Sequence, residues 1–311
     1  MGIDRVGTFV STQILLSQMQ RAQAALDDSN RQVASGKLSD KYSGYGGKTA
    51  AMEGARSASA HAQADYAAAQ QASSRLDLQD SQLSQLSDLA GDVRQALTKA
   101  AADQDSTALM DQMETLFEQV VGVLNANDGN GYTYGGDNSQ TPPVTVKTLS
   151  DLVALPSISD AFANGTVKTS VRTGNDTTVQ VGLLASDLGT QLFTLFQQLA
   201  QFDGGVNGPF PSGTTTPAQQ SFLESTIPTA ANAVADLNSQ AAANGIRYQS
   251  VQSSMTQLQS SATVYKDFVS KLEDVDVAEA LTKLNQNQIA LQASYQVTSQ
   301  LNQLSLLDYL P

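Results

Sequence analysis

The spacing of apolar residues between positions 251 and 272 constrains the fold of this chain more than any other feature. Apolar side chains recur there at alternating intervals of four and three residues, which places them along one side of an α-helix that faces a second helix. Two further stretches repeat this spacing, and Leu188, Leu192, Leu195 and Leu199 mark a shorter helix. The three long series are Val251, Met255, Leu258, Ala262, Tyr265, Val269 and Leu272; Ala69, Ala72, Leu76, Gln79, Leu83, Leu86, Ala90, Val93, Leu97 and Ala100; and Leu109, Met113, Leu116, Val120 and Val123. The fold class is therefore predicted to be mainly α, with helices over about 50–103, 106–125, 185–202 and much of 218–270.

The two ends of the chain carry the same spacing with more polar residues in it. Polar residues at such positions reduce the stability of a helix pair but specify its register and oligomeric state. The N-terminal series is Phe9, Thr12, Leu16, Met19, Gln23, Leu26, Asn30 and Val33, and the C-terminal series is Leu281, Leu284, Gln288, Leu291, Tyr295, Thr298 and Leu301. We expect these two helices to be weakly stable alone and to become ordered with partners.

The middle of the chain has a different composition. Between 125 and about 180 it is rich in Gly, Thr, Asn and Val, with alternating runs at 144–146 and 177–181 that favour short strands and turns. A second loop, 202–213, is punctuated by glycine and proline. The chain is thus predicted to run out along helices, build a β-rich insertion and return along antiparallel helices, so that its two ends meet as a coiled coil. The predicted domains are 1–40 with 273–311 for the terminal coiled coil, 48–125 with 185–272 for a helical bundle, and 126–184 for a β-rich domain.

Charge and composition exclude several classes of function. The chain has 311 residues, 17 of them basic and 30 acidic, for a net charge of −13. Because it lacks a run of Lys and Arg, nucleic acid and anionic membrane surfaces are poor partners. There is no cysteine, and His61 is the only histidine, so a site built on thiolates or on two imidazoles cannot form in one chain. No stretch has the apolar length of a membrane span or the form of a secretory signal, so composition alone predicts a cytosolic protein.

Three short motifs resemble sites of binding or catalysis, but the residues around each of them argue against that function. Gly47-Lys48-Thr49 resembles the end of a phosphate-binding loop, but Tyr42 stands where the first glycine is required. Asp128 begins a sequence like a calcium loop, which lacks the later ligands. Glu273, Asp274 and Asp276 could serve acid–base chemistry, although acidic residues before a helix more often cap it. The sequence therefore predicts no enzyme, no cofactor and no metal.

Several stretches resemble motifs of the flagellin-like axial proteins of the bacterial flagellum. Residues 33–39 (VASGKLS) are similar to the LSSG stretch that closes the N-terminal helix of that family, and residues 127–143 (NDGNGYTYGGDNSQTPP) to its G-x-Y-L-F-x-G…T-P-P turn. Residues 272–280 (LEDVDVAEA) and 288–293 (QIALQA) are similar to its I-E-D-x-D-x-A-E-A and Q-x-A-L-Q-A motifs. The ending 304–310 (LSLLDYL) resembles the family's hook-associated junction proteins more than flagellin. The chain departs from the family in two places: at 40–47, where an S-D-D-P/A-x-G element is usual, and at Thr133, where Leu is usual.

The resemblance implies a fold, a location and a set of partners. It implies paired terminal helices in an inner core, a helical domain outside them and a β-rich outer domain. It implies a structural protein without catalysis, exported unfolded and uncleaved through the flagellar type III channel, so that the expected location becomes the extracellular flagellum. The implied partners are other copies in a ring between hook and filament, a neighbouring hook-associated junction protein, flagellin, and an export chaperone bound to the C-terminal region.

The expected assembly interface consists of the apolar residues of the two terminal series and of the chain end. Its members are Phe9, Leu16, Met19, Leu26, Val33, Leu284, Leu291, Tyr295, Leu301, Leu304, Leu307, Tyr309 and Leu310. The alternative within the family is flagellin, the filament subunit. An alternative from another class is a secreted binding module or adhesin that uses residues 126–182, although only Tyr132, Tyr134 and Phe162 could stack on a sugar there.

Overall fold

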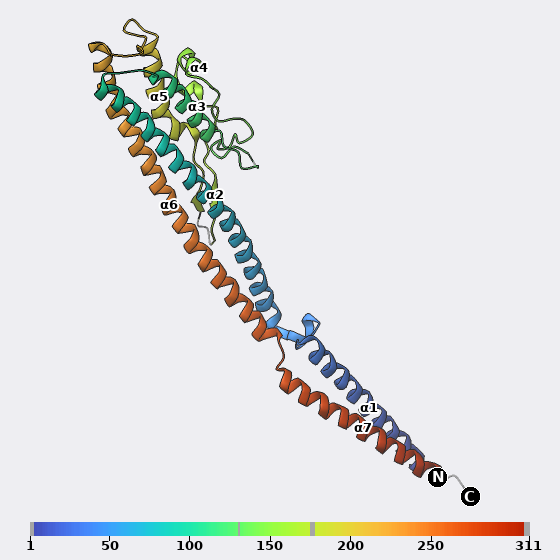
Figure 1. Ribbon diagram of the computed structural model, residues 1–311. Coiled ribbons are helices and arrows are strands. Elements are labelled where there is room, and N and C mark those ends of the chain that lie inside the picture. Colours follow the sequence, from blue (N-terminus) through green and yellow to red (C-terminus); the bar gives the residue numbers. More distant parts are fainter. Residues whose placement is uncertain (1–2, 130, 175–177, 308–311) are drawn as a thin grey trace. The chain divides into compact units, whose positions relative to one another are not determined.

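The computed structural model describes residues 3–129, 131–174 and 178–307, with side chains described from 13 to 300 within those ranges (Figure 1). Most of these residues are helical. The helices are α1 (Ile3–Ser35), α2 (Thr49–Asp103), α3 (Leu109–Leu124), α4 (Leu149–Ala154), α5 (Ala185–Asp203), α6 (Pro217–Glu273) and α7 (Val277–Leu307), and the short 3₁₀ helices are η1 (Tyr42–Lys48) and η2 (Ile158–Ala161). Two strands, β1 (Ser170–Arg172) and β2 (Thr178–Gln180), form an antiparallel pair. The predicted mainly α-helical fold is confirmed.

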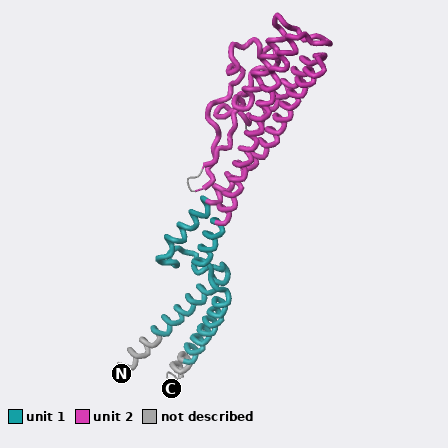
Figure 2. Tube along the Cα trace, turned by 90° about the vertical axis from the view of Figure 1, so that its left-hand side faces the viewer, with its two compact units in different colours: residues 1–61, 261–311 teal, residues 62–260 magenta. Residues whose placement is uncertain are grey.

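The chain divides into two compact units (Figure 2). Residues 1–61 and 261–311 form the first, and residues 62–260 form the second. Because α2 and α6 are 55 and 57 residues long, each of them contributes to both units. The first unit contains both ends of the chain.

The second unit has a continuous apolar core between α2, α3, α5 and α6. Every position of the predicted series from Ala69 to Ala100 is buried, as are those of the series in α3 and α5. Phe117 of α3 is central, with its ring centroid 5.1 Å from that of Phe193 and 5.3 Å from that of Phe196. The predicted periodicity therefore identifies the core-facing sides of α2, α3 and α5 correctly. In the series of α6 only Val251 and Leu258 are buried, and Tyr265 is exposed, so that series was partly wrong.

The segment between α3 and α5 contains less strand than its composition predicts. In the hairpin, Val171 lies opposite Val179, and the expected strand at 144–146 makes a single bridge, from Val144 to Phe162. The side-chain amide of Asn125 bonds both the N–H and the carbonyl of Val144, at 2.9 and 3.0 Å, which occupies groups that a longer ladder would need. Helix α4, which the sequence analysis missed, begins with a capping box between Thr148 and Asp151.

In the first unit, α1 and α7 lie side by side, as predicted for the two ends of the chain (Figure 1). Helix α1 is followed directly by Gly36, whose φ of +70° is a left-handed conformation that favours glycine. Helix α7 is preceded by Asp276, whose carboxylate accepts the N–H groups of Ala278 and Glu279 at 2.9 and 3.2 Å. The capping role favoured for this acidic cluster is confirmed for Asp276.

Candidate functional site at the paired terminal helices

The contact between α1 and α7 is a narrow seam of small and mid-sized side chains. The less exposed positions of both helices follow the four–three spacing of an antiparallel pair. They are Leu15, Met19, Ala22, Leu26, Ser29 and Val33 on α1, and Ala280, Leu284, Asn287, Leu291, Ser294 and Thr298 on α7. Ala, Ser and Thr occupy five of these twelve positions and Asn287 a sixth, so the seam buries little apolar surface for its length.

Polar contacts define the register of the seam. The Asn287 side-chain N–H₂ donates to Ser29 Oγ at 2.7 Å and to the Ala25 carbonyl at 3.2 Å. Ser29 is only 5% exposed. Further along, the Thr298 hydroxyl lies 3.3 Å from Met19 Sδ. A slip of the two helices would separate Asn287 from Ser29 and leave buried polar groups without partners, which carries a free-energy cost.

The seam differs from the predicted one by one residue in one column of each helix. On α1 the structure turns Ala22 and Ser29 inward instead of Gln23 and Asn30, which are exposed. On α7 it likewise turns Ala280, Asn287 and Ser294 inward in place of the predicted 281, 288 and 295. The small inward residues let the helix axes approach and form the contact between Asn287 and Ser29. The polar residues assigned to the seam from spacing alone were thus partly wrong.

The expected interface residues consequently fall into three groups. Met19, Leu26, Val33, Leu284 and Leu291 lie in the intramolecular seam. Leu16 and Tyr295 are outside it and are 54% and 52% exposed. The side chains of Phe9, Leu301, Leu304 and Leu307, and all of Tyr309 and Leu310, lie outside the described residues.

Large apolar side chains remain on the outer surface of the helix pair. Ile14 and Leu16 of α1 are exposed, as are Leu281, Ile289 and Tyr295 of α7, and Val297 and Val277 of α7 add to them. Leu16, Leu281 and Tyr295 each follow directly after a seam position, so they flank the seam on the same side of an antiparallel pair. Ile289 belongs to neither the predicted nor the observed seam. The only signal for it in the sequence is a large apolar residue at a position that the spacing leaves exposed.

Beyond the exposed ion pair of Glu279 and Lys283 near its start, α7 is also free of charge. From 284 to 307 the helix contains no Asp, Glu, Lys or Arg, although the chain as a whole carries −13. Residues 6–20 of α1 are equally uncharged. Buried cores of protein–protein interfaces are depleted of charged residues, and a solvated helix normally carries them. This uncharged surface with exposed apolar residues, hereafter the uncharged face, is therefore the strongest candidate interface among the described residues.

At the base of the helix pair, the two connecting segments are joined by backbone bonds. The Leu38 N–H donates to the Glu273 carbonyl at 2.8 Å, and the Val275 N–H donates to the Gly36 carbonyl at 2.9 Å. These bonds form a short antiparallel bridge between Lys37 and Asp274. The path of the chain out of α1 is thus tied to its path into α7.

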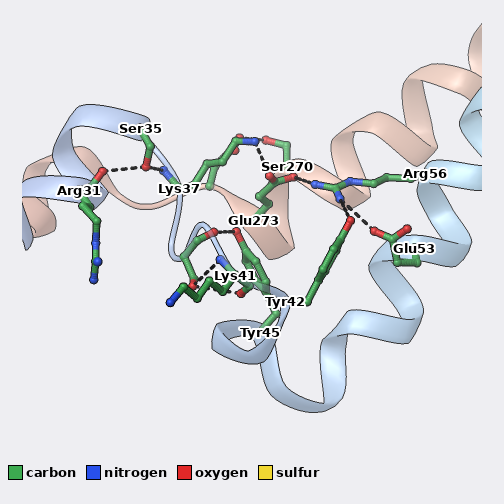
Figure 3. Close-up of polar contacts among 12 residues, drawn as sticks. Arg31, Ser35, Lys37, Lys41, Tyr42, Tyr45, Glu53, Arg56, Ser270 and Glu273 are labelled. Carbon is green, nitrogen blue, oxygen red and sulfur yellow. Dashed lines mark hydrogen bonds and ion pairs between the residues drawn. The ribbon is translucent and has the colours of Figure 1, made fainter. Parts of the chain in front are cut away.

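Glu273 reinforces this bridge with two ion pairs (Figure 3). Its Oε1 lies 2.6 Å from Lys37 Nζ and its Oε2 lies 2.6 Å from Arg56 Nη2, while Arg56 Nη1 reaches Glu53 at 2.9 Å. The hydrogen bond from Lys37, and then that from Arg56, lower the pKa of the Glu273 carboxyl against the opposing effect of its burial. Glu273 therefore stays ionised and links three segments of the first unit. The sequence shows Glu273 only as part of an acidic cluster, and its two cationic partners were not predicted.

The loop at 37–48 closes one side of this arrangement. Tyr45 is buried and its hydroxyl donates to the Ser39 carbonyl, while Tyr42 is exposed beside Arg56 (Figure 3). A cavity of about 290 Å³ lies between this loop, Met52 and Glu273.

No group of three or more His, Asp or Glu side chains in the described part of the chain is arranged to hold a metal ion. No described helix is long and apolar enough to span a membrane.

Comparisons with known proteins identify relatives of part of the sequence and of the fold. Residues 227–310 match the family described as the bacterial flagellin C-terminal helical region. A comparison with curated protein sequences finds no match. A solved structure described as a flagellar hook-associated protein from Vibrio parahaemolyticus is similar with a TM-score of 0.57 and 15% identity, over 75% of this chain and 99% of that one. The structure of FlgL from Bacillus cereus aligns with a TM-score of 0.47 and 13% identity, over 72% of this chain and 98% of that one. The C-terminal helices thus carry a flagellin-type sequence, and the fold is similar to that of the Vibrio protein.

Proposed function

We propose that this chain is a structural subunit of the bacterial flagellum, of the hook-associated protein 3 type, that forms a ring at the junction between hook and filament. The observation that carries the proposal is the uncharged face of α1 and α7. Such a face favours assembly, because covering its apolar groups with other chains contributes about 25 cal/mol per Å² of apolar surface removed from water. The flagellin-type match of residues 227–310 includes all of the described part of α7.

The weak internal seam supports assembly through these helices. Because the seam is rich in small and polar residues, it leaves the large apolar side chains of α7 for contacts with other chains. Tyr295 and Ile289 are respectively 52% and 66% exposed in the single chain. Covering equivalent residues around a closed ring would make assembly cooperative. We include Phe9, Leu301, Leu304, Leu307, Tyr309 and Leu310 in the proposed interface on the basis of the family resemblance.

The remaining parts of the proposal follow from the same resemblance. The partners are other copies of the chain, a neighbouring hook-associated junction protein and flagellin, and an export chaperone binds the C-terminal region before secretion. Export proceeds unfolded through the flagellar type III channel to the extracellular flagellum. Residues 1–40 with 273–311 form the assembly domain, 48–125 with 185–272 the helical domain, and 126–184 the outer domain. The role is structural and involves no catalysis.

Gene deletion and complementation in the source bacterium test the proposal. The deletion should leave hooks without filaments and release flagellin into the medium, as seen by electron microscopy and immunoblotting. The wild-type gene should restore filaments, and the double variant Ile289→Gln/Tyr295→Gln should not. The matched control is Ile246→Gln, which replaces an equally exposed apolar residue of the second unit and should restore filaments. Normal filaments in the deletion strain would contradict the junction role.

Flagellin itself is the alternative, and the match to the flagellin C-terminal helical region is the observation that favours it. The two subunits differ in whether they polymerise alone. A junction subunit should stay monomeric at concentrations at which a filament subunit forms long polymers. Sedimentation and electron microscopy of the purified chain decide between them, and filaments formed by this protein alone would overturn the junction assignment in favour of flagellin.

A further inference from the structure

Unpaired polar atoms are concentrated at one level of the second unit. Among the described residues, eight buried side-chain nitrogen or oxygen atoms have no hydrogen-bond partner in the protein. All eight lie within 75–82 of α2, 244–247 of α6, and the loop residues Thr133 and Tyr134. They are Arg75 Nε, Gln79 Nε2 and Oε1, Gln82 Oε1, Thr133 Oγ1, Tyr134 Oη, Asn244 Oδ1 and Arg247 Nη1. We call these seven residues the polar belt.

Direct bonds show that the three segments of the polar belt adjoin one another. The Asn244 N–H₂ donates to the Leu76 carbonyl at 2.9 Å, which places α6 against α2. Arg75 Nη2 donates to the Thr133 carbonyl at 2.8 Å, which places the loop against α2. The Tyr134 carbonyl in turn accepts the Ala185 N–H at 3.1 Å, at the start of α5. The polar belt therefore lies where the segment after α3 contacts the long helices.

Before and after the polar belt along α2 and α6, polar side chains of the two helices bond one another directly. Gln252 donates to Ser73 Oγ at 2.8 Å on one side, and Ser87 donates to Asn238 Oδ1 at 2.8 Å on the other. Within the polar belt, Gln79, Asn244 and Tyr134 are completely buried, yet atoms of each lack a partner. Leaving so many buried polar atoms unbonded would be costly, and native proteins satisfy nearly all such groups with protein or ordered water.

We propose that the polar belt is a buried water site that joins α2, α6 and the loop at 133–134. Three of the eight atoms only donate, three only accept, and the hydroxyls of Thr133 and Tyr134 can do either. Water, which both donates and accepts, can satisfy all three kinds. A buried water typically makes about three hydrogen bonds, so about three waters would satisfy the eight atoms. Burial raises the pKa of Tyr134, so its hydroxyl keeps its proton and can donate to such a water.

Replacing Tyr134 by Phe tests the proposal through the sign of its effect. If the hydroxyl binds water, Tyr134→Phe removes hydrogen bonds and should lower the urea midpoint of unfolding. If the site is dry, the same change removes an unsatisfied buried group and should raise the midpoint. Tyr132→Phe is the control: its ring is partly exposed, its hydroxyl is not among the unpaired atoms, and it should change the midpoint little. A raised midpoint for Tyr134→Phe would overturn the proposal.

A crystal structure of the full chain gives an independent test. Ordered water peaks within about 3.2 Å of Tyr134 Oη and the Gln79 amide are expected. Side chains that pair directly with no solvent between them would overturn the proposal. Because Arg75 and Arg247 have no ion-pair partner in the described part of the chain, the crystals should also be soaked in bromide. An anomalous bromide peak at Arg75 Nε or Arg247 Nη1 would assign the site to an anion and reject water.

Discussion

Arg56 Nη2 donates to Glu273 Oε2 at 2.6 Å and so joins two residues that are 217 positions apart in the sequence. Lys37 holds the other oxygen of the same carboxylate at 2.6 Å. The three residues lie where α1 ends, α2 begins and α6 ends, so one side chain ties together the connections that lead to both terminal helices (Figure 3). Several testable properties depend on this contact and on the seam beyond it.

Replacing Glu273 by Gln should weaken the first unit. The amide keeps the shape of the carboxylate but leaves Lys37 and Arg56 without their shared anion. Glu273 is buried while the two cations are partly exposed, so the loss should exceed that of an exposed surface pair. Thermal unfolding followed by circular dichroism should show a midpoint several degrees below that of the wild type. The control is Glu279→Gln, which removes an exposed pair with Lys283 and should leave the midpoint almost unchanged. Equal effects of the two variants would contradict the role assigned to Glu273.

The contribution of Glu273 should depend on pH with a defined sign. Its pKa in the folded chain is lower than the usual 4.5, mainly because of the hydrogen bond from Lys37. The unfolded state therefore takes up the proton first, and the stabilisation is complete above about pH 5, declines below the ordinary pKa and is lost below the folded pKa. Urea midpoints of the wild type and Glu273→Gln should differ at pH 7, and the difference should shrink progressively as the pH falls below the ordinary pKa. A difference that persists unchanged at pH 3 would show that the charge is not its cause.

Replacing Asn287 by Ala should loosen the α1–α7 pair. The change removes the bonds to Ser29 and Ala25, which together contribute about 1 kcal/mol. Amide hydrogen exchange along α7 should become faster, and exchange in the second unit should not change. Asn285→Ala is the matched control, because it makes the same gain in helix propensity at an exposed position two residues away. Unchanged exchange in the Asn287 variant would mean that the polar contact does not hold the helices together.

Replacing Phe117 by Ala should destabilise the second unit strongly. The ring is fully buried against Phe193 and Phe196, and removing such a ring costs about 3–5 kcal/mol through lost burial and a residual cavity. Equilibrium urea unfolding should show this loss. Phe268→Ala removes the same ring from an exposed site on α6 and should cost far less. A small effect at Phe117 would show that the core collapses around the substitution.

Much of the fold could be predicted because long helices carry their information locally. The series from Ala69 to Ala100 shows its apolar side over many turns, so each residue adds to the same signal, and the buried Gln79 is visible as its one polar member. The fold class and the pairing of the chain ends were therefore correct. The segment at 126–184 was less predictable, because short strands depend on partners that are distant in sequence, such as Phe162 for Val144.

The candidate site was predictable in outline and not in detail. Leu15 and Leu16 both fit a four–three series with Met19, and spacing alone does not decide which of these two adjacent columns faces the partner helix. The structure chooses the column with Ala22 and Ser29, because small side chains allow close approach and Ser29 can bond Asn287. That choice leaves Leu16 and Tyr295 on the outer surface.

The sequence by itself determined the long helices, the meeting of the chain ends and the uncharged stretch 284–307 of α7, because periodicity and composition are properties of consecutive residues. Only the tertiary structure decided which carboxylate of the 273–276 cluster would cap a helix and which would bind cations. Asp276 caps α7, whereas Glu273 lies within reach of Lys37 and Arg56. The physical reason is distance: Coulomb and hydrogen-bond energies depend on separations in space, which the folded chain sets for residues that are far apart in the sequence.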